Sequence, residues 1–153
     1  MNFSLARRQF TRLGACLAAL CVLPTRAASG KPDALTQRAQ AISGQAAIQT
    51  GRVTINTPRL ADNGHSVPII IRVESAMTER EYVRRIALVA ESNPRPIIAT
   101  FHLSAKSGLA EITTRIRLNR TQYVMAIAEL SDGTFWSDRA EVIVTESACL
   151  DAD

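Results

Sequence analysis

Apolar and polar residues alternate over most of residues 51–145, which is the pattern of strands with one buried face. In residues 111–118 every second position is apolar or Thr, whereas Arg115 and Arg117 fall on the opposite, solvent-facing side. The alternation predicts seven strands, over residues 53–56, 67–74, 82–91 (beginning at Tyr82 or Ile86), 97–103, 111–118, 123–130 and 140–145. Seven short strands about ten residues apart are typical of an antiparallel β-sandwich of the immunoglobulin type.

Turn residues separate these strands. Two prolines interrupt residues 93–96, and the Asp-Gly pair in residues 131–134 indicates a hairpin. Turns are also expected at residues 62–65 and 104–108. Thr78–Glu81 has the spacing of a capping box, which is compatible with a single helical turn. Pro68 belongs at the start of its strand or on an edge.

The periodicity before residue 51 is helical. Apolar residues recur at spacings of three and four between Leu35 and Ala46, and Asp33 can cap the first turn. We therefore expect one short, weakly amphipathic helix over residues 33–48, ahead of the sandwich.

The first 27 residues have the features of an export signal. Arg7-Arg8 precedes Gln-Phe, as in a twin-arginine motif, and an apolar core of about eleven residues follows over residues 13–23. A bilayer span needs about 20 apolar residues, so this core is too short to cross one. Cleavage is expected after Ala27 or one residue later. Residues 13–16, which end at Cys16, resemble a lipid-attachment box, but almost no hydrophobic core precedes them. The residues before Cys21 fit such a box poorly, and no membrane anchor is predicted.

Four segments result. The sequence predicts a signal peptide over residues 1–27, a linker and short helix over 28–50, a β-sandwich over 51–145 and a C-terminal tail over 146–153. Four of the 18 basic residues lie in the signal, so 14 remain against 14 acidic residues. The net positive charge therefore belongs to the signal, and nucleic acid is not expected as a partner.

The tail carries Cys149, the only cysteine after the signal. A single thiol is unusual in an exported protein, because oxidising compartments favour paired cysteines. From its position alone, Cys149 is compatible with a thiol that enters another protein's active site, with a tolerated surface thiol, or with a bond to a partner chain.

Other residues with reactive or ligating side chains do not form a recognisable catalytic or metal pattern. The exported part has two histidines, His65 in a turn and His102 near a strand end, whereas a zinc site needs three or four ligands. No cofactor motif is present, so we predict neither a cofactor nor a metal, and no enzyme. Trp136 is interpreted as core or edge packing.

The segment Ala-Glu-Leu-Ser-Asp-Gly-Thr-Phe-Trp at residues 128–136 carries a family resemblance. Further stretches resemble the same family in the same order, at residues 52–58, 61–64, 67–68, 75–79, 92–96, 100–103 and 113–118. Together they resemble SoxY, the sulfur-carrier subunit of the periplasmic thiosulfate-oxidising system.

This resemblance implies a fold, a location and partners. SoxY proteins have a twin-arginine signal, a short N-terminal helical segment and an immunoglobulin-like sandwich, and they pair with a smaller β-sandwich subunit, SoxZ. A c-type cytochrome enzyme loads thiosulfate onto a cysteine in a C-terminal Gly-Gly-Cys-Gly-Gly arm, and further enzymes process the sulfur. Cys149 lies at the matching distance, so the resemblance implies that it is the covalent sulfur carrier of a periplasmic protein.

The tail departs from the family's glycine-rich arm. Ser147 and Ala148 are small, but Leu150 adds bulk and Asp151 adds negative charge beside the thiol. The four residues from Thr145 to Cys149 reach about 13 Å when extended. Two functions follow as hypotheses. The first is a sulfur carrier loaded by partner enzymes, and the alternative is a non-carrier immunoglobulin-like subunit of another periplasmic oxidoreductase complex.

Overall fold

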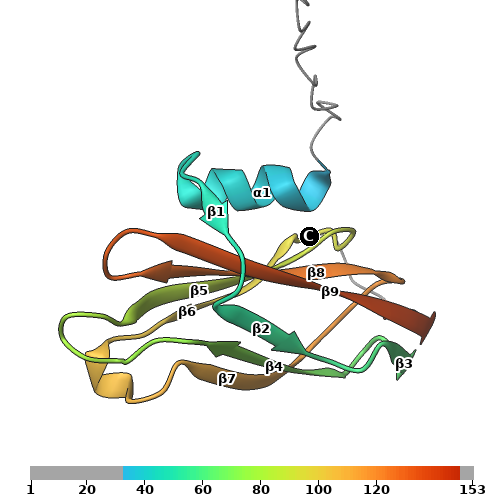
Figure 1. Ribbon diagram of the computed structural model, residues 1–153. Coiled ribbons are helices and arrows are strands. Elements are labelled where there is room, and N and C mark those ends of the chain that lie inside the picture. Colours follow the sequence, from blue (N-terminus) through green and yellow to red (C-terminus); the bar gives the residue numbers. More distant parts are fainter. Residues whose placement is uncertain (1–32, 149–153) are drawn as a thin grey trace, which may run out of the picture. The chain divides into compact units, whose positions relative to one another are not determined.

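The computed structural model describes residues 33–148 as two packed β-sheets with one helix (Figure 1). The predicted signal over residues 1–27 and the predicted carrier residue Cys149 lie outside the described residues. Among the described residues, no helix is long and apolar enough to cross a membrane.

The helical elements are the α-helix α1 and the short 3₁₀-helix η1, which span Ala34–Ser43 and Ala105–Ser107. The nine strands are β1 (Ile48–Gln49), β2 (Val53–Asn56), β3 (Leu60–Asn63), β4 (Val67–Val73), β5 (Val83–Ala90), β6 (Ile97–His102), β7 (Glu111–Ile116), β8 (Gln122–Leu130) and β9 (Phe135–Glu146).

The strands form a larger sheet in the order β1-β9-β8-β5-β6 and a smaller sheet in the order β2-β4-β7. All neighbours run antiparallel except β1 and β3, which both pair with β9 in parallel. The immunoglobulin-like sandwich predicted from the sequence is confirmed, with two short parallel strands added. They were not predicted because β1 has only two residues, and because β3, with the sequence Leu-Ala-Asp-Asn, does not alternate and overlaps the predicted turn.

The core lies between the two sheets. In β4 the inward residues Val67, Ile69, Ile71 and Val73 are buried, and the alternate positions are more exposed. Strands β5 and β8 have long runs buried on both faces instead of alternating. The reason is α1, which lies over their outer face (Figure 1).

Helix α1 is held by its cap and its apolar face. The side chain of Asp33 accepts a hydrogen bond from the Thr36 N–H at 2.7 Å, which satisfies one donor of the first turn. Leu35 and Ala39 are buried in a second apolar cluster with residues of β5 and β8. The guanidinium of Arg38 also donates to the carbonyls of Ala90 and Glu91, both at 2.6 Å.

The predicted helix over residues 33–48 is too long. It ends at Ser43, because Gly44 and Gln45 adopt left-handed backbone angles (φ 63° and 70°) that a helix cannot continue. Ile48 lies in β1 instead, beside Phe135 of β9.

Four further details differ from the predictions. The last strand starts at Phe135 and not at Ala140, and part of the predicted turn over residues 62–65 belongs to β3. No helix forms at Thr78–Glu81, although the Glu81 N–H does donate to the Thr78 hydroxyl as the capping-box spacing suggested. The 3₁₀-helix η1 lies within the segment predicted as a turn.

Candidate functional site: the root of the C-terminal tail

Cys149 follows directly after Ala148, so the candidate site is described through the residues that position Ala148. Three loops meet at this end of the sandwich, over residues 62–66, 92–96 and 117–121, and we call it the tail-root end. Figure 1 shows β9 and β3 finishing together there. The pairing of Asn63 with Glu146 places the ends of these two strands side by side.

The last residues of β9 are fixed by side-chain hydrogen bonds as well as by strand pairing. The hydroxyl of Thr121 accepts from the Val144 N–H at 2.9 Å and donates to the Val144 carbonyl at 3.4 Å. The hydroxyl of Thr145 donates to the carbonyl of Asp62 at 2.8 Å. The end of β9, where the tail begins, therefore has a defined position.

The sequence predicts a tail that extends away from the sandwich after Thr145, but the chain stays in contact with the domain as far as Ala148. The N–H of Ala148 donates to the carbonyl of Leu118 at 3.2 Å, and Ala148 is only 4% exposed. Although Ser147 is exposed, the tail is docked one residue later. The prediction failed because a single alanine beyond the end of a strand belongs to no periodic pattern that would indicate its burial.

Gly64 makes this docking possible. Its N–H donates to the Glu146 carbonyl at 2.7 Å, and its own carbonyl accepts from the Leu118 N–H at 2.8 Å. A Cβ at this position would collide with the Leu118 carbonyl oxygen and lie 3.0 Å from the Ala148 nitrogen. The sequence identified Gly64 as a turn residue, but not as the point where three chain segments meet.

A buried network of side-chain amides fixes two loops of the tail-root end, over residues 92–96 and 117–121. The side-chain NH₂ of Gln122 donates to the side-chain oxygens of Asn93 at 2.8 Å and Asn119 at 2.9 Å. The Gln122 oxygen accepts from the Ser92 N–H at 2.8 Å, and Asn93 donates to the Arg117 carbonyl at 2.9 Å. Within residues 33–148 no buried side-chain nitrogen or oxygen lacks a partner. This network thus holds the loop that contains the Leu118 carbonyl in a fixed position.

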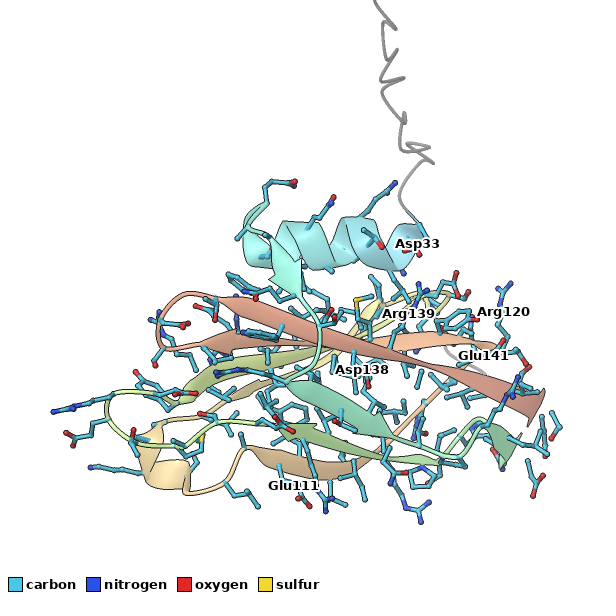
Figure 2. The ribbon with its side chains drawn as sticks, viewed as in Figure 1. Asp33, Glu111, Arg120, Asp138, Arg139 and Glu141 are labelled. Carbon is cyan, nitrogen blue, oxygen red and sulfur yellow. The ribbon has the colours of Figure 1, made fainter. Side chains whose placement is uncertain are left out.

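Arginines surround this root. Arg95, Arg117 and Arg120 are exposed, and Figure 2 shows Arg120 on the outside of the domain at the tail-root end. Arg115 donates to the carbonyl and hydroxyl of Ser66 at 3.2 and 3.1 Å. Positive charge thus gathers around the point from which the tail continues.

Three surface hollows lined by described residues lie elsewhere. Two of them, of about 540 and 450 Å³, share Tyr82 and Ser104 at the opposite end of the sandwich. A third, of about 400 Å³, is bordered by Thr50 and Arg139. None of these three hollows includes a residue of the tail root.

The structure also places Trp136, His65 and His102, the other residues considered from the sequence. Trp136 lies in β9 against the core, donates to the Thr134 hydroxyl at 3.0 Å and carries Arg52 over its ring at 5.2 Å. His65 and His102 are exposed. Over residues 33–148 no group of three or more His, Cys, Asp and Glu is placed to hold a metal ion.

The family comparison relates this site to known proteins. The sequence model described as sulfur oxidation protein SoxY matches residues 38–149, from α1 through the tail root to Cys149. The chain belongs to the SoxY family. It is thus a carrier protein of sulfur oxidation, not an enzyme, from a periplasmic family that works with the Sox system. A search of curated protein sequences found no match.

Solved structures show the same fold. The sulfur carrier protein SoxY from Chlorobium limicola f thiosulfatophilum matches with a TM-score of 0.60 at 22% identity, covering 72% of this chain and 91% of that one. A superoxide reductase (neelaredoxin) from Ignicoccus hospitalis matches with a TM-score of 0.57 at 16% identity, covering 63% and 94%. A putative superoxide reductase from Thermotoga maritima gives a TM-score of 0.55 at 18% identity, covering 65% and 95%.

Proposed function

We propose that this SoxY-family protein carries thiosulfate-derived sulfur covalently on Cys149 and presents it to partner enzymes. The observation that carries the proposal is the family match, which extends to Cys149, the only cysteine after residue 21. Support also comes from the position of Ala148 at the end of the sandwich. Covalent geometry places the Cα of Cys149 about 3.8 Å from that of Ala148.

The chemistry of loading requires an external oxidant. The thiolate sulfur of Cys149 would bond to the outer sulfur of thiosulfate, giving a cysteine S-thiosulfonate. One proton is released from the thiol, and two electrons pass to a c-type cytochrome enzyme, as the family resemblance implies. Water would then release sulfate and leave a persulfide on the carrier. Both steps need enzymes that approach Cys149.

The contact of Ala148 with the domain shortens the distance that the Cys149 thiol can reach. With Ala148 bound to Leu118, the tail cannot use the 13 Å span from Thr145 that the sequence suggested. Releasing Ala148 costs about 1 kcal/mol for the hydrogen bond and less than about 1 kcal/mol for the buried methyl. Since 1.4 kcal/mol is tenfold in population, a total of about 1–2 kcal/mol would leave Ala148 released in roughly one molecule in five to thirty. A partner enzyme can therefore bind the docked tail or capture the released one.

The test is the state of Cys149 in cells that oxidise thiosulfate. Intact-mass analysis of the isolated protein should find adducts of sulfur atoms or of thiosulfonate, and these should be absent from Cys149→Ser. The substitution should also stop sulfur oxidation without changing the thermal unfolding of the domain. An unmodified tail in active cells, with normal growth of Cys149→Ser on thiosulfate, would contradict the proposal.

A partner subunit is the second part of the proposal. Strands β6 and β7 each pair on one side only, and Ile97 and Leu109 near them are 53% and 65% exposed. The opposite side is closed, because Asp138 of β9 accepts from the Ile55 N–H of β2 at 2.9 Å. Unpaired strand edges with apolar neighbours favour a partner that covers them. We propose a SoxZ-like subunit, and co-purification as a heterodimer tests it.

The export route is a proposal from the sequence. The Arg7-Arg8 motif would direct the folded protein through the twin-arginine pathway to the periplasm. Replacing both arginines by lysine should keep the protein in the cytoplasm with its first residues uncleaved. Export of that variant at the native rate would contradict the route.

The contact of Ala148 with Leu118 also favours one alternative function. A tail that is held at Ala148 and continues with Leu150 and Asp151 is less suited to enter a narrow enzyme active site than a glycine-rich arm. A non-carrier immunoglobulin-like subunit of another periplasmic oxidoreductase complex would keep the fold and the partner surface without using the thiol. In that case Cys149→Ser would leave every activity of the complex unchanged.

A further inference from the structure

Two consecutive arginines of β5 reach the same carboxylate. Nη1 of Arg84 lies 3.5 Å from Oε1 of Glu129, and Nη2 of Arg85 lies 2.8 Å from its Oε2. Neighbouring residues of a regular strand point to opposite faces of the sheet, so they do not normally share a partner. Here the pairing of β5 with β8 shifts register between Val83 and Arg85. Arg84 is therefore the extra residue of a β-bulge, and the bulge turns both guanidinium groups toward one carboxylate.

Strand register adds a histidine to this group. Strand β5 lies between β8 and β6, and Arg85 pairs with Glu129 on one neighbour and with His102 on the other. Directly paired residues have Cβ atoms about 4.5–5.5 Å apart on the same face of a sheet. Phe101, the residue before His102, packs against the core between the sheets. The side chains of Glu129, Arg85 and His102 therefore form a row across the outer face of the larger sheet.

This row borders a hollow of about 450 Å³, which we call the β5–β6 hollow. Its lining includes Tyr82, Arg84, Arg85, His102 and Glu129. Two guanidinium groups line it against one carboxylate, so its net charge is positive before any protonation of His102. Polar groups that converge from several strands on a concave surface are a common feature of small-ligand sites.

The carboxylate lies deeper than the two cations. The side chain of Glu129 is 19% exposed, whereas those of Arg84 and Arg85 are 54% and 33% exposed. Glu129 also orients Arg85, because its Oε2 accepts from Nε of Arg85 at 3.0 Å. Nη2 of Arg85 donates to the carbonyl of Ile42 at 3.4 Å, which holds the guanidinium from a second direction. A ligand that enters the hollow therefore meets positioned guanidinium groups before it meets the carboxylate.

We propose that the β5–β6 hollow binds a small tetrahedral dianion such as sulfate, thiosulfate or hydrogen phosphate. Arg84 and Arg85 supply charge-assisted hydrogen bonds to its oxygens, and His102 supplies a further donor from β6. A dianion gains more Coulomb energy from two cations than chloride or acetate does. Glu129 orients Arg85 but repels the ligand, so it limits the affinity. The site is separate from the tail root, and the inference does not depend on the carrier function of Cys149.

Sulfate is the probe for the test, because it does not react with a thiol. When the ¹⁵N-labelled protein is titrated with sulfate at constant ionic strength, the amide signals of residues 84, 85 and 102 should shift and saturate. Arg84→Gln and Arg85→Gln should each weaken binding about three- to tenfold, as expected for a charge-assisted hydrogen bond at a partly exposed site. Glu129→Gln should bind sulfate more tightly, because the repelling carboxylate is gone.

The ion pair of Arg59 with Glu141 provides matched controls. Glu141 pairs with Tyr123, which lies six residues from Glu129 along β8, or about 20 Å. Arg59→Gln and Glu141→Gln make the same charge changes there, and each should alter sulfate affinity by less than about twofold, because exposed charges so far apart are screened.

Further arms of the experiment identify the ligand class and separate the site from the carrier thiol. Thiosulfate and phosphate should displace sulfate, whereas chloride and acetate at the same ionic strength should not. Cys149→Ser should bind sulfate as the native protein does, so failure of the carrier function and failure of this site are distinguishable. The proposal would be overturned by the absence of saturable shifts, by an equal loss of affinity in Arg59→Gln, or by Glu129→Gln binding sulfate no more tightly than the native protein.

Discussion

The two ends of the sandwich are built differently. The tail-root end is held by buried amides, since Asn93 and Gln122 are 8% and 3% exposed and bond to each other and to two loops. The opposite end, with loops over residues 74–82, 103–110 and 131–134, relies on exposed or half-buried contacts such as Tyr82 N–H to the Ser131 hydroxyl at 3.1 Å. A buried network is costly to break, whereas exposed hydrogen bonds exchange readily with water.

This difference indicates which end of the protein needs a fixed backbone geometry. The rigid end is the one from which the tail continues toward Cys149, and its network fixes the carbonyl that holds Ala148. The opposite end contains the two larger surface hollows described above, but no buried polar network of this kind among its described residues. The following substitutions test the comparison, beginning with the largest expected effect.

Gly64→Ala should be the most damaging change at the tail-root end. The added methyl would collide with the Leu118 carbonyl, and backbone atoms on three segments cannot all move aside. We expect the free energy of unfolding to fall by about 3 kcal/mol, at the upper end for overpacking. Urea denaturation measures the loss, with the exposed neighbour His65→Ala as control, for which a change within about 0.5 kcal/mol is expected. A fully stable Gly64→Ala protein would contradict the close approach of the three segments.

Gln122→Ala compares directly with Ser131→Ala at the opposite end. Loss of the Gln122 amide leaves the Ser92 N–H without its acceptor and removes donors from Asn93 and Asn119, so unfolding should become about 2–3 kcal/mol easier. Ser131 accepts from Tyr82 at a half-buried site that water can enter, so its loss should cost about 1 kcal/mol or less. Equal losses in the two variants would remove the distinction between the ends.

Two aspartates allow a finer comparison. Asp33 caps α1 through the Thr36 N–H, and Asp132 accepts from the N–H and hydroxyl of Thr134 at 2.9 and 2.7 Å in the opposite end's hairpin. Asp33→Ala should lower stability by about 1 kcal/mol, because a helix loses its cap. Asp132→Ala should have a smaller effect, since only a local exposed turn is lost. Thermal unfolding of both variants checks the order.

The pH dependence of these two sites should be the smallest effect. Hydrogen bonds from Thr36 hold the pKa of Asp33 below its ordinary value of 3.8, and those from Thr134 do the same for the pKa of Asp132. Since the folded pKa lies below the unfolded one, the stabilisation is complete above pH 3.8 and is lost as the pH falls through the folded value. The double variant Asp33→Asn/Asp132→Asn should therefore show a shallower loss of stability below pH 4. If the double variant lost stability below pH 4 as steeply as the native protein, these pKa shifts would be contradicted.

Local patterns in the sequence predicted much of the fold. Alternation, or short apolar runs between turn residues, located the seven main strands, and the Asp33 cap with the following apolar spacing located α1. The parallel strands β1 and β3 were missed because they are short and owe their position to β9 rather than to their own pattern. The predicted end of α1 was wrong because the apolar spacing continues past Gly44, where the backbone turns into the left-handed region.

By itself the sequence determined the family, the position of Cys149 as the only cysteine after residue 21, and the sandwich, because strand periodicity and residue identity are properties of the chain alone. Only the tertiary structure decided that Ala148 is buried and bonded to Leu118, that Gly64 has no room for a side chain, and that Gln122 joins Asn93. These contacts join residues 29 to 84 positions apart, and nothing in the local pattern indicates which distant groups will meet. The position from which the tail continues is for this reason a property of the folded domain.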